Sequence, residues 1–177
     1  MKINVLLLFI LALGMCSCKK TEPRRAINLT KVSELEKTIA VNKILFSEEQ
    51  NLMKKYMELD SSLVYKNSRK GFWYAYLHKV NNSVFPKKGD IVVFEQEIIA
   101  LDGTVLFAKK DLGLRSYVVD KEHIIKGLKE GLKLMKEGEE VKFLFSSFVA
   151  YRMNGDTSRI IGSNEPVLST VKLIKIN

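Results

Sequence analysis

The stretch IVVFEQEIIAL at residues 91–101 constrains the possible folds more than any other part of this sequence. It is a long run of β-type residues, and Asp102-Gly103 follows it directly, which is a strong signal for a hairpin turn. Four further segments also read as strands, at residues 72–80, around 116–119, at 140–148 and at 166–176.

One segment of the second half reads as a helix. In HIIKGLKEGLKLM, residues 123–135, the apolar side chains fall on one helical face and the lysines stay outside it. That face consists of Ile124, Ile125, Leu128, Leu132 and Met135. Gly138 marks the end of this helix or the turn beyond it. One short helix on a twisted, mostly antiparallel β-sheet predicts an α+β domain.

The N-terminus has the layout of a secretory signal. Lys2 is followed by VLLLFILALG, ten residues without a polar side chain. A membrane-spanning helix needs about 20 apolar residues, so this run is too short to be the anchor itself. A buried N-terminal helix is the alternative, but we find nothing obvious for such a run to pack on.

The only two cysteines lie directly after this apolar run. Their placement resembles a bacterial lipoprotein signal, which is cut before a cysteine that receives a lipid. The small Ser17 precedes Cys18, whereas the bulky Met15 precedes Cys16, so we assign residues 1–17 to the signal and the lipid to Cys18. Because the following KKTEP is not acid-rich, we expect an exported lipoprotein of the outer membrane that faces the periplasm.

The chain after Cys18 divides into three parts. Residues 18–46 are polar and charge-rich without a long periodic pattern, which predicts a lipid-anchored tether. Ser47 and Gln50 form a capping-box pattern, and the apolar spacing that follows predicts a short N-terminal helix in an extension over residues 47–70. Residues 71–177 then form the main domain.

The basic charge does not indicate nucleic-acid binding. The chain has 29 basic and 20 acidic residues, and removing residues 1–17 leaves a net charge of +8. The basic residues come as scattered doublets with no run of five and no aromatic residues between them. We interpret them as a solvated surface; contact with anionic lipid is the alternative for Lys19, Lys20, Arg24 and Arg25.

Ordinary catalytic groups are missing. The two histidines, His78 and His123, lack metal-ligand spacing, and the sequence contains no glycine-rich phosphate loop, serine elbow or HExxH motif. We therefore predict no metal and no cofactor.

Four segments in order resemble the FKBP-type peptidyl-prolyl cis-trans isomerases. They are FPKKGDIVV, LDGTVLF, HIIKGLKEGLKLMKEGEEVKFLFSSFVAY and NEPVLSTVKLIKIN, within residues 71–177. A narrower likeness, through GFWYAYL and NGDTSRIIGSNEPVLSTVKLIKI, is to the FKBP-like lipoproteins associated with gliding motility in Bacteroidetes. The resemblance implies an FKBP-like fold, isomerase activity on proline-containing exported polypeptides, and gliding or secretion machinery as a partner.

The resemblance also implies a binding cup. Tyr151 matches the tyrosine whose hydroxyl bonds the ligand, Ile125 offers a backbone N–H, and Leu128 takes the place of an aromatic floor. Further matches line the rest of the cup or its rim, namely Gln96, Leu106, Phe107, Ile124, Ile160, Ile161 and Ser169. For the isoleucines and Leu128, packing in the core is an equal alternative.

Three positions depart from the family pattern. Gln96 stands where tyrosine is usual, Ser169 stands where phenylalanine is common, and Leu106-Phe107 replaces Phe-Asp. Phe107 can serve as the wall by a one-residue slip, but the acid is absent. These changes leave two readings: a membrane-anchored isomerase that helps exported proteins to fold, or a non-catalytic FKBP-like scaffold of an envelope or motility complex.

Overall fold

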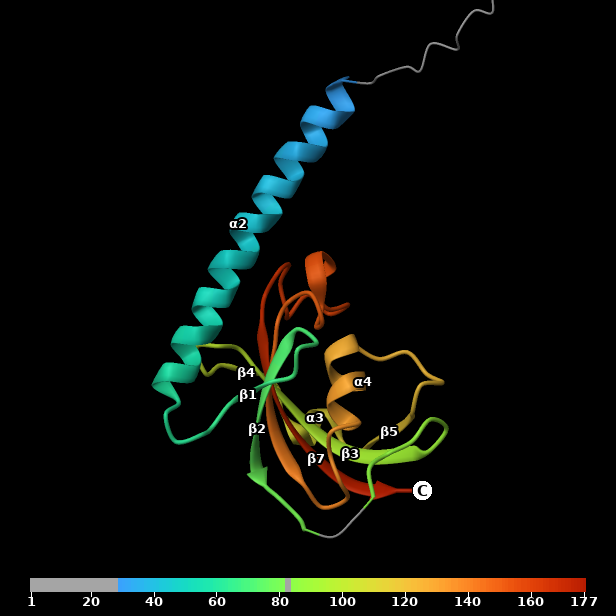
Figure 1. Ribbon diagram of the computed structural model, residues 1–177. Helices are drawn as coiled ribbons and strands as arrows, with labels where there is room; N and C mark the ends of the chain where they lie inside the picture. Colours follow the sequence, from blue (N-terminus) through green and yellow to red (C-terminus); the bar gives the residue numbers. More distant parts are fainter. Residues whose placement is uncertain (1–28, 82–83) are drawn as a thin grey trace, which may run out of the picture. The chain divides into compact units, whose positions relative to one another are not determined.

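The computed structural model describes residues 29–81 and 84–177 (Figure 1). The predicted signal at 1–17 and the predicted lipid site at Cys18 lie outside the described residues. The chain divides into two units, residues 1–38 and 39–177, and every strand of the described residues lies in the second. None of the helices described here combines the length and the apolar character needed to cross a membrane.

The N-terminal helix α2 is longer than predicted. It extends over Leu29–Leu59 and includes much of the expected tether. Ser47 lies inside this helix, and its hydroxyl donates a hydrogen bond to the carbonyl of Ile44 at 2.8 Å, so it is not a cap. The segment expected as a tether is thus helical from Leu29 onward, because it contains neither glycine nor proline and is rich in residues with high helix propensity.

The strands form one antiparallel sheet in the order β1-β2-β6-β7-β3-β4, with β5 paired to β3. Their bounds are Lys66–Asn67 for β1, Phe72–His78 for β2, Ile91–Ile99 for β3, Val105–Phe107 for β4, Arg115–Val118 for β5, Glu140–Phe145 for β6 and Val167–Ile176 for β7. The Asp102-Gly103 turn joins β3 to β4 as predicted, and Gly103 has a φ of 93°, which suits glycine.

Two short helices and one 3-10 turn complete the domain. They are α3 at Lys109–Leu112, α4 at Lys126–Leu132 and η1 at Arg152–Asn154. Helix α4 is shorter than the apolar pattern predicted, because Ile124 and Ile125 precede it and Met135 belongs to the turn that follows. The α+β class is as predicted, with α4 on one face of the curved sheet (Figure 1).

The main core lies between α4 and the sheet. Leu128, Leu132 and Met135 from the helix side pack with β-strand aromatics such as Phe143 and Phe145, and all five are at most 1% exposed. Two glycines of α4 allow this close approach, because a Cβ atom at either position would overlap a phenylalanine ring of β6. The position of α4 is therefore tightly fixed against the sheet.

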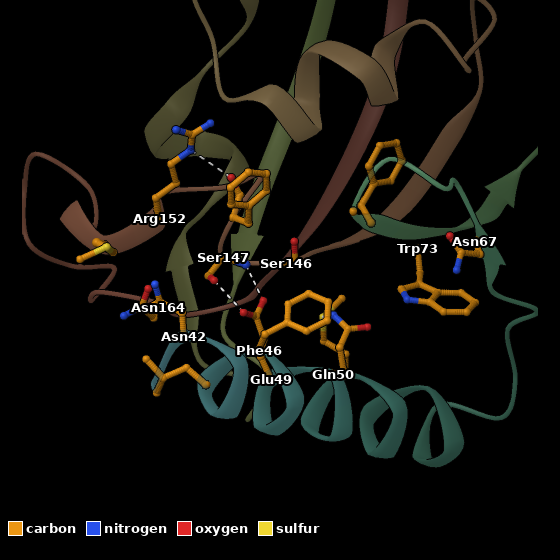
Figure 2. Close-up of a pocket in the computed structure, with 16 residues that line it drawn as sticks. Asn42, Phe46, Glu49, Gln50, Asn67, Trp73, Ser146, Ser147, Arg152 and Asn164 are labelled. Carbon is orange, nitrogen blue, oxygen red and sulfur yellow. Dashed lines mark hydrogen bonds between the residues drawn. The ribbon is translucent and has the colours of Figure 1, made fainter. Parts of the chain in front are cut away.

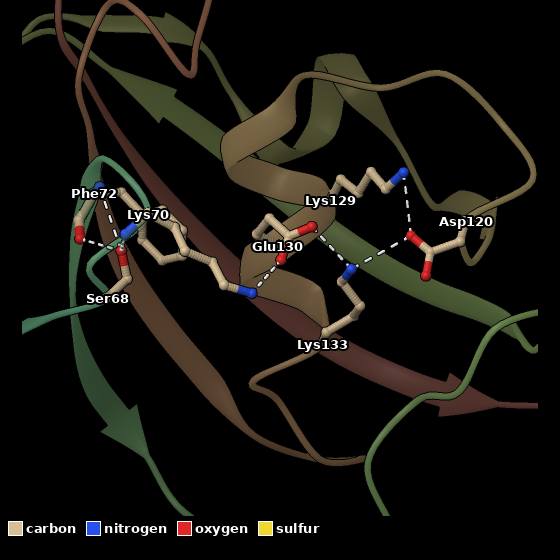
Figure 3. A network of polar contacts seen from close by, with 7 residues as sticks. All are labelled: Ser68, Lys70, Phe72, Asp120, Lys129, Glu130 and Lys133. Carbon is tan, nitrogen blue, oxygen red and sulfur yellow. Dashed lines mark hydrogen bonds and ion pairs between the residues drawn. The ribbon is translucent and has the colours of Figure 1, made fainter.

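A chain of ion pairs holds the outer side of α4 (Figure 3). Lys133 lies 2.8 Å from Glu130 and 3.3 Å from Asp120, and Lys129 lies 3.1 Å from the same Asp120 oxygen. Lys70, in the turn before β2, also pairs with Glu130. Burial favours a higher pKa for Glu130, but the two lysines outweigh burial and lower it. The network joins α4 to the turn before β2, through Lys70, and to the turn after β5, through Asp120.

Candidate functional site

A pocket of about 460 Å³ opens at the start of α4. It is lined by Gln96, Arg115, His123, Ile124, Ile125, Leu128 and Tyr151. Five of these seven residues were predicted for the cup from the sequence, and they come from β3, from α4 with the segment before it, and from the loop after β6. The structure therefore brings together predicted residues that are up to 55 positions apart in the chain.

Helix α4 supplies the apolar floor of this pocket. Leu128 is 1% exposed, and Gly127 donates its N–H to the carbonyl of Val149 at 2.8 Å, which ties α4 to the loop after β6. Ile125 occupies the position before the helix, where backbone N–H groups lack partners within the helix. Within the described ranges, no protein acceptor takes the Ile125 N–H. This group is therefore available to a ligand.

Tyr151 provides a second donor group. Tyr151 lies in the loop between β6 and η1. The Val149 carbonyl of this loop accepts the N–H of Gly127, which holds the loop and the tyrosine ring beside α4. Burial raises the pKa of the Tyr151 hydroxyl, the Arg115 charge opposes that rise, and Asp156 adds to it. The hydroxyl is thus protonated at neutral pH and can donate a hydrogen bond.

One wall of the pocket is polar, because Gln96 and Arg115 line it. Gln96 and Ser169 are each 1% exposed, and the Gln96 amide donates to the Ser169 hydroxyl at 2.9 Å. Arg115 donates from a guanidinium nitrogen to the amide oxygen of Gln96 at 2.7 Å. The two departures from the family pattern at Gln96 and Ser169 are thus one hydrogen-bonded pair on neighbouring strands, rather than two independent losses.

The other five predicted residues, which include Ser169, do not line this pocket. Leu106 and Phe107 lie in β4 and are partly buried against the core, and Ile161 is 1% exposed within the core. Ile160, beside it, is 48% exposed. For Ile161 the structure favours the alternative of core packing.

Sequence reasoning missed Arg115 and His123. Arg115 could have been found from the alternation along β5. Tyr117 and Val119 face inward, and residue 115 lies on the same side of the strand. His123 directly precedes the predicted isoleucine pair, and its side chain is exposed.

A larger groove of about 750 Å³ lies within the second unit, between residues 42–53 of α2 and residues 146–153 (Figure 2). Its floor and walls include Phe46, Met53 and Phe148. The carboxylate of Glu49 accepts hydrogen bonds from the N–H and the hydroxyl of Ser147, at 2.5 and 2.7 Å. The groove was missed because residues 18–46 were interpreted as a tether. Its apolar side chains offer a binding surface.

The part of the chain that the structure describes contains no group of three or more histidine, cysteine, aspartate or glutamate residues placed to hold a metal ion.

A family model and a curated relative agree on one family. A family model described as "FKBP-type peptidyl-prolyl cis-trans isomerase" matches residues 82–174. A Neisseria meningitidis serogroup B protein, "Probable FKBP-type peptidyl-prolyl cis-trans isomerase FkpA", is 40% identical over 91 residues. That match covers 51% of this chain and 33% of the relative, so the chain spans about a third of the length of this curated relative.

Two crystal structures resemble the fold. A peptidyl-prolyl cis-trans isomerase from Pseudomonas syringae pv. tomato superposes with a TM-score of 0.62 at 17% identity, over 76% of this chain and 95% of that one. The three FKBP domains of wheat FKBP73 give a TM-score of 0.56 at 20% identity, over 64% of this chain and 48% of that one. These likenesses confirm the predicted FKBP-like fold.

Proposed function

Because the chain belongs to the FKBP-type peptidyl-prolyl cis-trans isomerase family, we propose that it catalyses the cis–trans isomerisation of X-Pro bonds in polypeptides. The observation that supports this most is the shared pocket of Leu128, Ile125 and Tyr151. It combines an apolar floor with two hydrogen-bond donors, and it needs no nucleophile.

The chemistry follows from the amide bond. Rotation about a peptide bond crosses a barrier of about 18–20 kcal/mol because resonance is lost when the amide twists. An apolar floor removes water from the prolyl ring, and fixed donors stabilise the carbonyl oxygen of the twisted amide. In this pocket, Leu128 is the floor, while the Ile125 N–H and the Tyr151 hydroxyl are the donors.

Tyr151→Phe tests the proposal. This change removes one hydrogen bond of about 0.5–1.5 kcal/mol but keeps the ring, so the isomerisation rate of an X-Pro peptide should fall by roughly twofold to tenfold. Arg152→Gln, at the next residue but in the larger groove, is the matched control and should leave the rate unchanged. A wild-type rate equal to the uncatalysed rate would exclude the activity.

We further propose that the protein acts on exported polypeptides at the bacterial envelope, anchored by a lipid on Cys18 and facing the periplasm, in association with gliding or secretion machinery. The apolar run before Ser17-Cys18 supports this proposal. Cys18→Ala should leave an uncleaved or lipid-free protein, whereas Cys16→Ala should be processed normally. An unmodified Cys18 on a mature, membrane-bound protein, found by mass measurement, would overturn the lipid assignment.

A second candidate function is a non-catalytic scaffold. The polar wall of the pocket and the apolar groove of Figure 2 support it, since both suit binding without turnover. Gln96→Tyr and Ser169→Phe, made together because the two side chains bond each other, restore the usual walls. If neither wild type nor this double variant isomerises a peptide while envelope proteins still bind the wild type, the scaffold function replaces the isomerase.

A further inference from the structure

The polar wall of the smaller pocket presents hydrogen-bond donors and a positive charge. Gln96 is fixed by its two bonds, with its amide oxygen toward Arg115 and its amide nitrogen toward Ser169. Its acceptor oxygen is therefore already used by Arg115. A guanidinium has five N–H donors, and in the described residues Arg115 gives one to a protein acceptor.

No acidic side chain of the described residues pairs with the charge of Arg115. None of the ion pairs formed among residues 29–81 and 84–177 includes Arg115. Its guanidinium lies 5.5 Å from the ring centre of Phe94, a contact that orients the group and leaves its charge intact. The seven residues that line the pocket include no carboxylate.

One acid to consider is Asp156, which raises the pKa of Tyr151 from the following loop. Its carboxylate is occupied, because it accepts the N–H of Ile161 at 2.6 Å and the N–H of Ser158 at 3.0 Å, as well as the Ser158 hydroxyl. Asp156 therefore stabilises its own loop and forms no ion pair with Arg115.

We propose that Arg115 recognises an acidic side chain of the substrate, so that the polypeptides preferred by this pocket have aspartate or glutamate next to the proline. This inference rests on the proposed isomerase function and adds a substrate class to it. Arginine suits the role because its planar N–H pairs match the two oxygens of a carboxylate. The partly enclosed pocket shields the pair from solvent and strengthens it.

The test compares peptides that differ only in charge. One pair is Ala-Glu-Pro-Phe and Ala-Gln-Pro-Phe, the other Ala-Leu-Pro-Glu and Ala-Leu-Pro-Gln, all with acetylated and amidated ends so that the side chain is the sole anion. A fifth peptide, acetyl-Ala-Gln-Pro, has a free C-terminus. It tests whether Arg115 recognises a main-chain carboxylate instead of an acidic side chain. Exchange rates are measured by two-dimensional NMR with the full-length protein.

In the wild type, the acidic member of at least one pair should be isomerised about tenfold faster than its amide partner. Arg115→Gln should abolish that preference, so that within each pair the acidic and the amide peptide are isomerised at the same rate. Arg152→Gln, an arginine of the larger groove, should keep the preference. If Arg115→Gln fails to fold, the preference of the wild type must still shrink as salt is raised, because ions screen the attraction.

The outcomes separate the two proposals. Equal rates for acidic and amide peptides, a preference that survives Arg115→Gln, or a gain limited to the free C-terminus each overturn the acidic-side-chain inference and leave the isomerase function intact. If no peptide is isomerised but NMR titration shows Arg115-dependent binding of the acidic peptides, isomerase activity is excluded and the recognition by Arg115 stands. Loss of both turnover and binding overturns both proposals.

Discussion

Gly127→Ala should show that the packing of α4 sets both the stability and the activity of the domain. A Cβ atom at this position would lie 2.8 Å from Cε1 and 3.0 Å from Cγ of Phe145, and closer still to Cδ1. Ordinary carbon contacts are about 3.5–4.0 Å. Phe145 cannot move aside, because it is fully buried, stacks on Phe143 at 5.2 Å and meets the edge of Phe72 at 5.5 Å.

The magnitude follows from two opposing effects. Alanine favours a helix over glycine by about 0.8–1.0 kcal/mol, whereas overpacking a core costs about 1–3 kcal/mol and occasionally more. Since three ring atoms are overlapped, we take the upper part of that range and expect a net loss of about 2 kcal/mol in the free energy of unfolding. This corresponds to a fall of roughly 4–8 °C in melting temperature for a domain of this size.

The same change should also lower activity, because Ile125 and Leu128 lie within two residues of Gly127 and should be displaced with it. Thermal melts followed by circular dichroism and a peptide isomerisation assay measure the two effects. Gly131→Ala is the matched control: it overlaps Phe143 at 2.9 Å one turn further from the pocket, so it should lose stability but keep its rate per folded molecule. A Gly127→Ala protein as stable as wild type would refute the reasoning.

Three further predictions concern other parts of the domain. Leu128→Ala should destabilise the fold by about 2–5 kcal/mol in denaturant melts, since its side chain is buried. Glu49→Ala should cost about 1–3 kcal/mol, measured the same way, because it leaves the buried N–H and hydroxyl of Ser147 unpaired, and Glu49→Gln should cost less. Burial favours a higher pKa for Asp60, but hydrogen bonds from Lys142 and two neighbours outweigh it and lower that pKa. The stability that ionised Asp60 contributes is present above the unfolded pKa of about 3.9 and is lost as pH falls through the folded pKa. The melting temperature of Asp60→Asn should therefore depend less on pH below about 4 than that of wild type.

Local patterns predicted the parts of the fold that depend on local rules. Asp102-Gly103 specified a hairpin because a tight turn needs a residue that tolerates positive φ, and the structure has that turn. The apolar face from Ile124 to Met135 predicted the buried side of α4, but its length was overestimated because residues in flanking turns are buried as well. The length of helix α2 was underestimated instead. Exposed apolar residues such as Leu35 and Ile39 leave it without a clear apolar face.

The pocket was only half predictable for a different reason. Tyr151 and Leu128 follow from resemblance, whereas the bond between Gln96 and Ser169 joins residues 73 positions apart. A single sequence shows each substitution but not that the two side chains meet. Their pairing depends on β3 and β7 being neighbours in register, and Arg115 then completes the wall from β5.

The position of β7 has a consequence for how the chain acquires its structure. This strand, Val167–Ile176, pairs with β6 on one side and with β3 on the other, although it comes last in the described chain. Until it docks, the pair β2 and β6 has no ladder to the group of β3, β4 and β5. Closing the sheet thus requires contacts between distant parts of the chain, which is slow compared with local pairing. A growing polypeptide therefore cannot complete this sheet before β7 has been made.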